Sequence, residues 1–553
     1  MLGISSVEAN PVFGKPYPLV QPDGTVLPCV VWGDEIHRRV EMPNGYSVVP
    51  NSVTGWYEYG KLENGRLLPS GLVAGYASDE DLGGAGLTAH LSDRHAVAAE
   101  ALQRKAELRK RQAALNPDQE EPAARRAVTG SFKNLVMCVD FKAESDPPTK
   151  ARHKYATSLF KTALYATTGQ SMVTYYKENS YGTFKPSGYV YPNWIVLPQT
   201  ASYYKAMGDS GWRQIISDAM DVIRTANPTF NFNAWANGTV LNPIVIWAGQ
   251  TEGWSDFFWP HQGEFTLSKN GVTVNGYLAV NEQDVSSSGT VTANTDLGTF
   301  CHEFGHMIGA PDLYDYDAFQ ALPNGFYCLM GIGSATTHIC GFIKWKYFGW
   351  VTPVELAADS TGMTFPVSAL ALQAPTKPRL YRVKINGSNK EYFLIENRED
   401  GTGVFENFLY GGGWTRKSGL HITHVDENMF PAVYTWIVNL GFSTTYPSLS
   451  HKFYGVEAVT PSMPATINEL MAYLYLWGDM VFSKSLGYTK LTPIFPINRA
   501  PGKFATVYYA QNGVLDTEHL AFPNTNGHTA LSHVSFTTIS NPGNVMSFKF
   551  LYQ

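Results

Sequence analysis

The sequence predicts a multidomain α+β protein in which a central α/β domain lies between a small N-terminal β/α domain and a C-terminal β-rich, sandwich-like domain. Its 553 residues exceed what one hydrophobic core usually supports. Strand and helix patterns alternate in the middle of the chain, whereas turn residues separate short apolar runs towards both ends. The domain boundaries that we expect are 1–128, 129–352 and 353–553.

The N-terminal domain is expected to contain short strands, then a helix and a linker. Turn residues separate the apolar runs of residues 10–78, and residues 92–115 are rich in helix-forming Ala, Leu, Glu, Lys and Arg. The polar, proline-containing segment 116–127 indicates an exposed linker, which is where proteases prefer to cut. Arg125 and Arg126 are the candidate cleavage positions, so the first domain is predicted to be removable.

The central domain is expected to alternate strands with helices. Apolar runs predict strands at 132–141, 189–197, 243–249 and 272–280. Helical patterns occupy 151–168 and 212–226. We expect the last of these strands to form the edge of the sheet. After Trp350 the sequence is again rich in strands and turns, with its clearest strands at 392–396 and 419–425.

The most specific local signal is the run from His302 to Asp312, which has the form H-E-x-x-H-x-x-G-x-x-D. Histidines at positions i and i+4 share one face of a helix, so His302 and His306 can bind one Zn²⁺. Gly309 can end the helix and turn the chain, because glycine tolerates a positive φ. Asp312 would then be a third ligand and leave a fourth position open for water, as catalytic zinc sites do. Glu303 is expected to be the general base.

The surroundings of this run favour a metal site over a solvated pair of histidines. Residues 295–301 are mostly uncharged, which indicates a buried helix in which His and Glu need partners. Met330 lies downstream in a glycine-flanked segment, and metzincin-like sites place a methionine turn beneath the metal. The alternative is that Met330 only fills the core. A zincin-type fold is therefore predicted for the central domain.

Composition excludes some classes of function. The net charge is −6, which gives no general affinity for nucleic acid. The sequence has no run of 18 or more apolar residues, so no transmembrane helix is expected, and no signal peptide is apparent in the chain as given. Five cysteines leave at least one thiol unpaired within the chain. A bond among Cys301, Cys328 and Cys340 would lie close to the metal motif.

Several segments resemble the immune inhibitor A family of secreted zinc metallopeptidases. The main similarity is HEFGHMIGAPDLYD at 302–315. Weaker similarities occur in family order and cover most of the chain: QPDGT at 21–25, GDEIH at 33–37, NSYG at 179–182, WPHQ at 259–262, LMGIG at 329–333, KWKYFGWV at 344–351, EYFLIENRE at 391–399 and GLHITHVDE at 419–427.

This resemblance implies a secreted zinc endopeptidase that is made as a zymogen and cleaves proteins or peptides. It assigns His302, His306 and Asp312 as zinc ligands, Glu303 as the base, and the first domain as a propeptide. Family members often carry an Asp-rich segment that could bind Ca²⁺, but the corresponding residues 233–242 contain no carboxylate. A calcium ion is thus compatible with the family but has no assigned position in this sequence.

Latency requires a group that covers the open metal position. The thiolate of Cys29 could do so, because thiolates are strong zinc ligands. Asp34, Glu35 and His37 are the other candidates in the propeptide-like region. The alternative is that Cys29 is a small buried apolar residue.

Two other functions are compatible with the same motif. The zincin domain could be a catalytically silent scaffold of a surface-binding or adhesion protein, or it could hydrolyse a non-peptide bond. The intact His302, Glu303 and His306 favour an active enzyme over a scaffold. An edge strand beside the site favours a peptide, because an extended substrate can pair with it.

Overall fold

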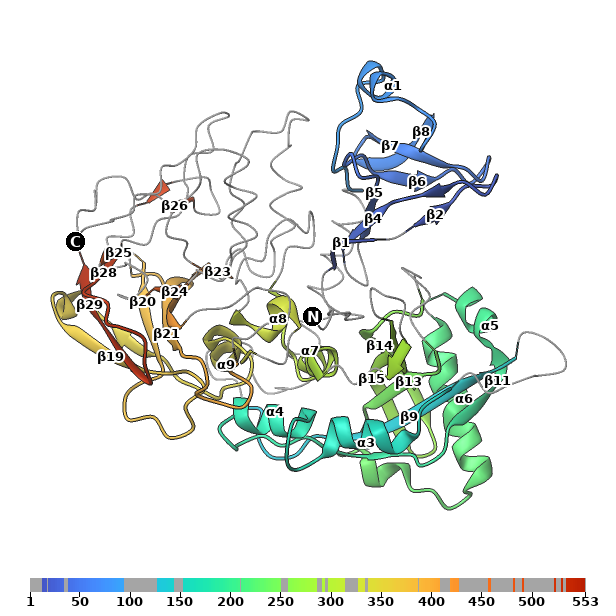
Figure 1. Ribbon diagram of the computed structural model, residues 1–553. Helices are drawn as coiled ribbons and strands as arrows, with labels where there is room; N and C mark the ends of the chain where they lie inside the picture. Colours follow the sequence, from blue (N-terminus) through green and yellow to red (C-terminus); the bar gives the residue numbers. More distant parts are fainter. Residues whose placement is uncertain are drawn as a thin grey trace.

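The protein is described by a computed structural model, in which α helices and several β sheets are combined, as predicted (Figure 1). The structure describes residues 12–33 except 17, 38–93, 127–143, 153–249 except 209, 257–285, 291–293, 297–313, 327–333, 337–407 except 386, 418–426, 456–458, 481–482, 490–491, 522–523, 529–530 and 534–552. Within these residues no helix is long and apolar enough to cross a membrane.

The N-terminal part of the chain forms three small antiparallel sheets and one short helix (Figure 1). The elements are β1 (Val12–Pro16), β2 (Leu19–Val20), β3 (Val26–Leu27), β4 (Val30–Gly33), β5 (Arg38–Glu41), β6 (Val48–Pro50), β7 (Tyr57–Glu63), β8 (Arg66–Val73) and α1 (Asp79–Gly84). Leu27, Val48, Tyr59 and Leu82 are buried together in one core. The expected strands of residues 10–78 are present, whereas the helix expected at 92–115 lies outside the described residues apart from its first two positions.

A seven-stranded sheet forms the centre of the molecule. Strand β9 (Lys133–Lys142) pairs in parallel with β10 (Ser187–Val190), β11 (Ile195–Thr200) and β13 (Pro243–Trp247). Strand β15 (Val272–Asn281) continues the parallel order beside β13 and also pairs with β12 (Val240–Leu241). Parallel neighbours need crossover connections, and here helices supply most of them.

One edge of this sheet is β14 (His261–Lys269), which runs antiparallel to β15. Because β15 has neighbours on both sides, the prediction that residues 272–280 form the edge strand is wrong. The two strands are joined by Asn270 and Gly271, whose φ angles are 52° and 81°. Positive φ at both central residues is typical of a type I′ hairpin turn, for which Asn-Gly is a favoured pair.

Helices cover both faces of the central sheet (Figure 1). The elements on one face are α3 (Thr157–Tyr165), α4 (Met172–Asn179) and α7 (Leu297–Met307), and those on the other are α5 (Ala201–Ala206) and α6 (Ser210–Ala226). Successive side chains of a strand point to opposite faces. Accordingly, Val136 and Cys138 of β9 belong to the core under α7, whereas Leu135 and Met137 belong to the core under α6.

Two further sheets form the C-terminal part. One contains β18 (Val354–Leu356), β20 (Leu380–Lys384), β21 (Glu391–Arg398), β22 (Gly419–Asp426), β23 (Val456–Ala458) and β24 (Val481–Phe482). The other contains β19 (Thr364–Ser368), β25 (Lys490–Leu491), β28 (Val534–Thr537) and β29 (Val545–Tyr552). Phe393 and Ile395 of β21 share a core with Phe536 and Phe548 of the second sheet.

The remaining described elements are short. They are the helices α8 (Leu329–Ile332) and α9 (Gly341–Lys346), the 3-10 turns at Phe232–Trp235 and Ala358–Ser360, and the strand pairs β16 (Gln283–Val285) with β17 (Val291–Ala293) and β26 (Phe522–Pro523) with β27 (Thr529–Ala530). Helices α8 and α9 lie beside α7, between the central sheet and the C-terminal sheets (Figure 1).

Candidate metal centre

Helix α7 carries the H-E-x-x-H run and is buried on every side. Each residue from Gly298 to His306 is buried, as expected for a helix with apolar residues around most of its circumference. The helix ends at Gly309, whose φ of 101° is accessible to glycine with little strain. The amides of Gly309 and Ala310 donate to the carbonyls of His306 and Gly305, both at 2.9 Å, which closes the last turn. The chain therefore turns back towards the helix just before Asp312.

Three side chains of this region converge on one point. Asp312 Oδ1 lies 3.0 Å from His302 Nε2 and 3.1 Å from His306 Nε2, and the two Nε2 atoms are 3.1 Å apart. Ligands held about 2.0–2.1 Å from a tetrahedral ion lie roughly 3.3 Å from one another. The triangle of donor atoms is thus close to the size that a zinc ion requires. Among the described residues, this is the one group of three or more His, Cys, Asp and Glu side chains that could share an ion.

The hydrogen bonds of the two imidazoles show which nitrogens face this point. His302 Nδ1 lies 3.2 Å from the carbonyl of Leu329, and His306 Nδ1 lies 2.8 Å from the carbonyl of Ala310. A carbonyl only accepts, so each neutral ring carries its proton on Nδ1 and directs the lone pair of Nε2 inwards. Two lone pairs and a carboxylate oxygen facing one another need a cation between them, and this donor set suits zinc.

The electrostatics of Asp312 agree with a charged carboxylate. Burial alone would raise its pKa, but in the metal-free site a proton carried by the imidazoles of His306 and His302 outweighs burial and holds the pKa well below its usual range. Asp312 therefore stays ionised and able to bind a cation at neutral pH.

Glu303 and Met330 are buried in two elements, α7 and α8, that flank this centre. Glu303 follows His302 in α7 and is only 1% exposed. Met330 is fully buried in α8, and its Sδ would lie 2.8 Å from a Cβ built on Gly305, between the two histidines in sequence. Met330 O also accepts a 2.8 Å hydrogen bond from the amide of Leu313, next to Asp312. Helix α8, which contains Met330, thus packs against α7 and is also bonded to the segment that contains Asp312.

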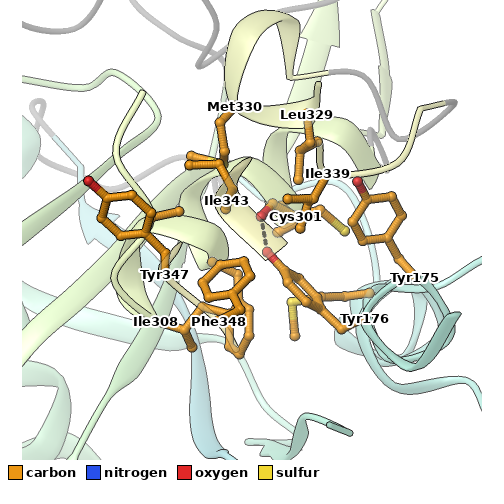
Figure 2. Packing of buried hydrophobic residues seen from close by; sticks show 14 of the residues in the cluster. Tyr175, Tyr176, Cys301, Ile308, Leu329, Met330, Ile339, Ile343, Tyr347 and Phe348 are labelled. Atoms are coloured by element: carbon orange, nitrogen blue, oxygen red, sulfur yellow. Dashed lines mark hydrogen bonds between the residues drawn. The ribbon is translucent and has the colours of Figure 1, made fainter. Parts of the chain in front are cut away.

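Figure 2 shows the apolar packing around this turn. Leu329, Met330, Ile339 and Ile343 cluster beside the helix segment that contains Cys301. The hydroxyl of Tyr176, from α4, donates to the carbonyl of Cys301 at 2.5 Å. These contacts fix α7 within the core, so the histidines project from a rigid support.

The five cysteines are all described and all carry free thiols, so no bond joins Cys301, Cys328 and Cys340. Instead, the amide of Cys340 lies 3.3 Å from Cys328 Sγ. Cys29 is buried in the N-terminal core, with its thiol 3.6 Å from Met42 Sδ. Burial raises the pKa of the Cys29 thiol to about 11, so it is protonated at neutral pH. This environment favours the alternative that Cys29 is a small buried apolar residue over a role as a zinc-binding thiolate.

The other candidates for latency and cleavage cannot be placed. Asp34, Glu35 and His37 lie outside the described residues, as do Arg125 and Arg126.

A buried polar cluster beside the turn that contains Met330 (α8, Leu329–Ile332) was not predicted from the sequence. Arg398, Glu396, Glu406 and His338 are all fully or almost fully buried, and they link β21 to the segment before α9. The available signal was the charged run Glu396-Asn397-Arg398 at the end of an otherwise apolar strand. Charged residues are seldom fully buried unless they are paired, so that run pointed to a structural ion pair.

One segment of the chain matches a known protein family. Residues 246–350 match the family model of the immune inhibitor A peptidase M6, catalytic domain. The matched segment runs from β13 past α9 and contains the whole candidate centre, which makes this part of the chain a metallopeptidase. The resemblance to the immune inhibitor A family is thereby confirmed for residues 246–350. No curated protein matches the chain.

Proposed function

We propose that this protein is a zinc-dependent endopeptidase whose zinc is held by His302, His306 and Asp312. The observation that carries the proposal is the convergence of these three donor atoms within 3.1 Å of one another. It supports zinc because the convergence lies inside a segment that matches a metallopeptidase catalytic domain. The histidines come from one face of α7, and Gly309 turns the chain so that Asp312 can join them.

The chemistry proposed for the site is peptide hydrolysis. A zinc ion bound there would polarise the scissile carbonyl and lower the pKa of a water towards about 7. Glu303 would accept the proton of the attacking water on its carboxylate and pass it to the leaving amine. The carbonyls of Leu329 and Ala310 hold the two imidazoles in the tautomer that leaves Nε2 free of a proton. Burial of Glu303 shields this proton transfer from bulk solvent.

The substrate class is inferred from the edge of the sheet. β14 is paired only with β15 among the described strands, so its other side can pair with an extended peptide. This feature favours a peptide over other hydrolysable substrates. The intact motif gives no support to a catalytically silent scaffold for adhesion.

We further propose that the protein is secreted and that residues 1–128 act as a removable propeptide. Val31 and the partly buried Val40 of the N-terminal sheets pack against Trp259, which lies just before β14. On the other side of the candidate cleavage positions, Val128 is bonded to the catalytic part. Its amide donates to Phe348 O at 2.9 Å, and its carbonyl accepts from Trp350 Nε1 at 2.7 Å. Cleavage after Arg125 or Arg126 would therefore release the first domain and leave the new N-terminus anchored.

An assay on casein tests this proposal, with the full-length chain compared before and after limited trypsin digestion. We expect digestion to raise activity, a zinc chelator to abolish it, and added zinc to restore it. Activity that is insensitive to the chelator would contradict the zinc mechanism. Full activity before digestion, with no further increase, would contradict latency but leave the zinc mechanism standing.

A further inference from the structure

Arg398 lies at the end of β21 and is fully buried. Its Nε and Nη2 donate to Glu406 at 2.6 and 2.9 Å, and Nη1 donates to Glu396 at 3.1 Å. The guanidinium is thus held in a fixed orientation by two carboxylates of the C-terminal part. Both carboxylates also bind elsewhere, because Glu406 accepts from the amide of His338 and Glu396 accepts from the amide of Gly341.

The same guanidinium reaches the segment that leads into the Met330 turn. Nη1 donates to the carbonyl of Tyr327, and Nη2 donates to the hydroxyl of Thr337 at 3.0 Å. The centre of the Tyr327 ring lies 5.5 Å from Arg398 Cζ and 5.2 Å from the ring of His421. Tyr327 is therefore fixed through its main chain and through its side chain by residues of β21 and β22.

Tyr327 is close in sequence to Leu329 and Met330, which contact the candidate metal centre. Two residues later, the carbonyl of Leu329 faces His302 Nδ1 at 3.2 Å. Met330 follows, with its side chain against Gly305 and its carbonyl bonded to the amide of Leu313. The position of this short helix thus affects the orientation of His302 and the path of the segment that contains Asp312.

We propose that Arg398 is a positioning residue for the metal centre, acting through the carbonyl of Tyr327 and the turn that contains Leu329 and Met330. The inference rests on the proposed metal site and adds to it a residue of the C-terminal part that touches neither ligand nor substrate. Groups that orient metal ligands from behind typically change metal affinity about 10–100-fold when they are removed.

Arginine is required because its planar fork serves four partners at once. Lysine keeps the charge but has a single nitrogen, which cannot reach Glu406, Glu396 and Tyr327 together. Arg398→Lys should therefore release the turn without leaving an uncompensated carboxylate pair in the core.

The test uses the full-length chain with its metal removed. Zinc affinity is measured by competition with a chelator, and the visible absorption of the cobalt-loaded protein reports on ligand geometry. We expect Arg398→Lys to weaken zinc binding about 10-fold or more and to alter the cobalt spectrum. Arg39→Lys is the matched control, because Arg39 is a buried, carboxylate-paired arginine of the N-terminal part. It should leave both readouts unchanged.

Near-ultraviolet circular dichroism establishes that each variant is folded. If Arg398→Lys does not fold, Glu396→Gln provides the same test, because it keeps the side-chain shape and loosens Nη1. Wild-type affinity and spectrum in a folded Arg398→Lys or Glu396→Gln variant would overturn the inference while leaving the proposed function intact. Failure of the wild-type chain to bind zinc would overturn both.

Discussion

At the scale of single residues, the centre is defined by the groups that its donor atoms face. His302 and His306 direct their Nδ1 protons to main-chain carbonyls, so their Nε2 atoms present only lone pairs to Asp312. Such an arrangement is repulsive without a cation, and the surrounding helix is too tightly buried to relax easily. This arrangement supports the proposal that the histidines and Asp312 bind a metal ion, whereas Glu303 is proposed to transfer the proton.

Glu303→Gln separates these two roles. The amide cannot accept the proton of the attacking water, so we expect hydrolysis to fall by about 10²–10⁴-fold. Zinc content should stay at the wild-type level, because the three ligands are unchanged. Casein hydrolysis and elemental analysis on the same preparation measure both effects. Hydrolysis at the wild-type rate would remove Glu303 from the mechanism.

His261 gives the protein a predictable sensitivity to acid. Burial lowers its pKa to about 4, from an ordinary value of 6.5, although its hydrogen bond to Trp259 acts in the opposite direction. The unfolded chain therefore gains this proton near pH 6.5, whereas the folded chain resists it until about pH 4. The contribution of His261 to stability is complete above pH 6.5 and is lost as the pH falls through this window.

Thermal unfolding at several pH values tests this statement. His261→Gln cannot gain a proton, so its melting temperature should fall less than that of the wild type between pH 6.5 and 4. Equal losses in the two proteins would show that His261 does not contribute to the acid response.

At the scale of elements, the fit between α7 and α8 decides how precisely the histidines are held. Gly305 allows Met330 to approach the helix, since a Cβ there would lie 2.8 Å from the methionine Sδ and 3.3 Å from the Tyr176 hydroxyl. Alanine at position 305 would favour the helix by up to about 1 kcal/mol but would push α8 away.

We therefore predict that Gly305→Ala lowers casein hydrolysis and zinc affinity, and that adding Met330→Ala partly restores both. Gly83→Ala is the matched control, because Gly83 also lies in a helix, α1, and a Cβ added there would meet no described atom within 4 Å. It should leave activity unchanged. Wild-type zinc affinity in Gly305→Ala would show that the fit between the helices is not critical.

Helices and strands with a clear pattern of apolar residues could be predicted from the sequence. The order of the strands within a sheet could not. The amphipathic helix expected at 212–226 is α6, and the apolar run of 243–249 contains β13. The edge of the sheet was misassigned because strand order depends on long-range pairing, which one strand's pattern does not encode. The site itself followed from spacing within about ten residues, where helix geometry is decisive.

At the scale of the whole molecule, the C-terminal part completes the core around the metal centre. Tyr392 and Leu394 of β21 lie in the same core as Phe304 and Met330, while alternate residues of that strand face the second sheet. Arg398 adds a polar link to the same interface. No local sequence pattern could reveal this interface, because β21 and the helices α7 and α8 are far apart in sequence and meet only in the folded chain.

We predict that a chain ending at residue 352 fails to fold cooperatively, because it exposes this core and removes the partner carboxylate of the His338 amide. A chain beginning at residue 127 is the control and should stay folded, because the apolar cluster that joins the N-terminal sheets to Trp259 is small. Near-ultraviolet circular dichroism and thermal unfolding compare the two. A cooperative transition in the chain that ends at residue 352 would contradict this view of the core.

The proposed function depends on zinc binding by His302, His306 and Asp312 together. The most direct measurement is the zinc content of the full-length chain and of His302→Ala, His306→Ala and Asp312→Ala, with His153→Ala as a histidine control outside the centre. We expect about one zinc per chain in the wild type and control, and strong loss in the other three, because each of them removes one of the three donor atoms that a zinc site needs. Zinc retained at the wild-type level in Asp312→Ala, or absent from the wild type, would contradict this proposal.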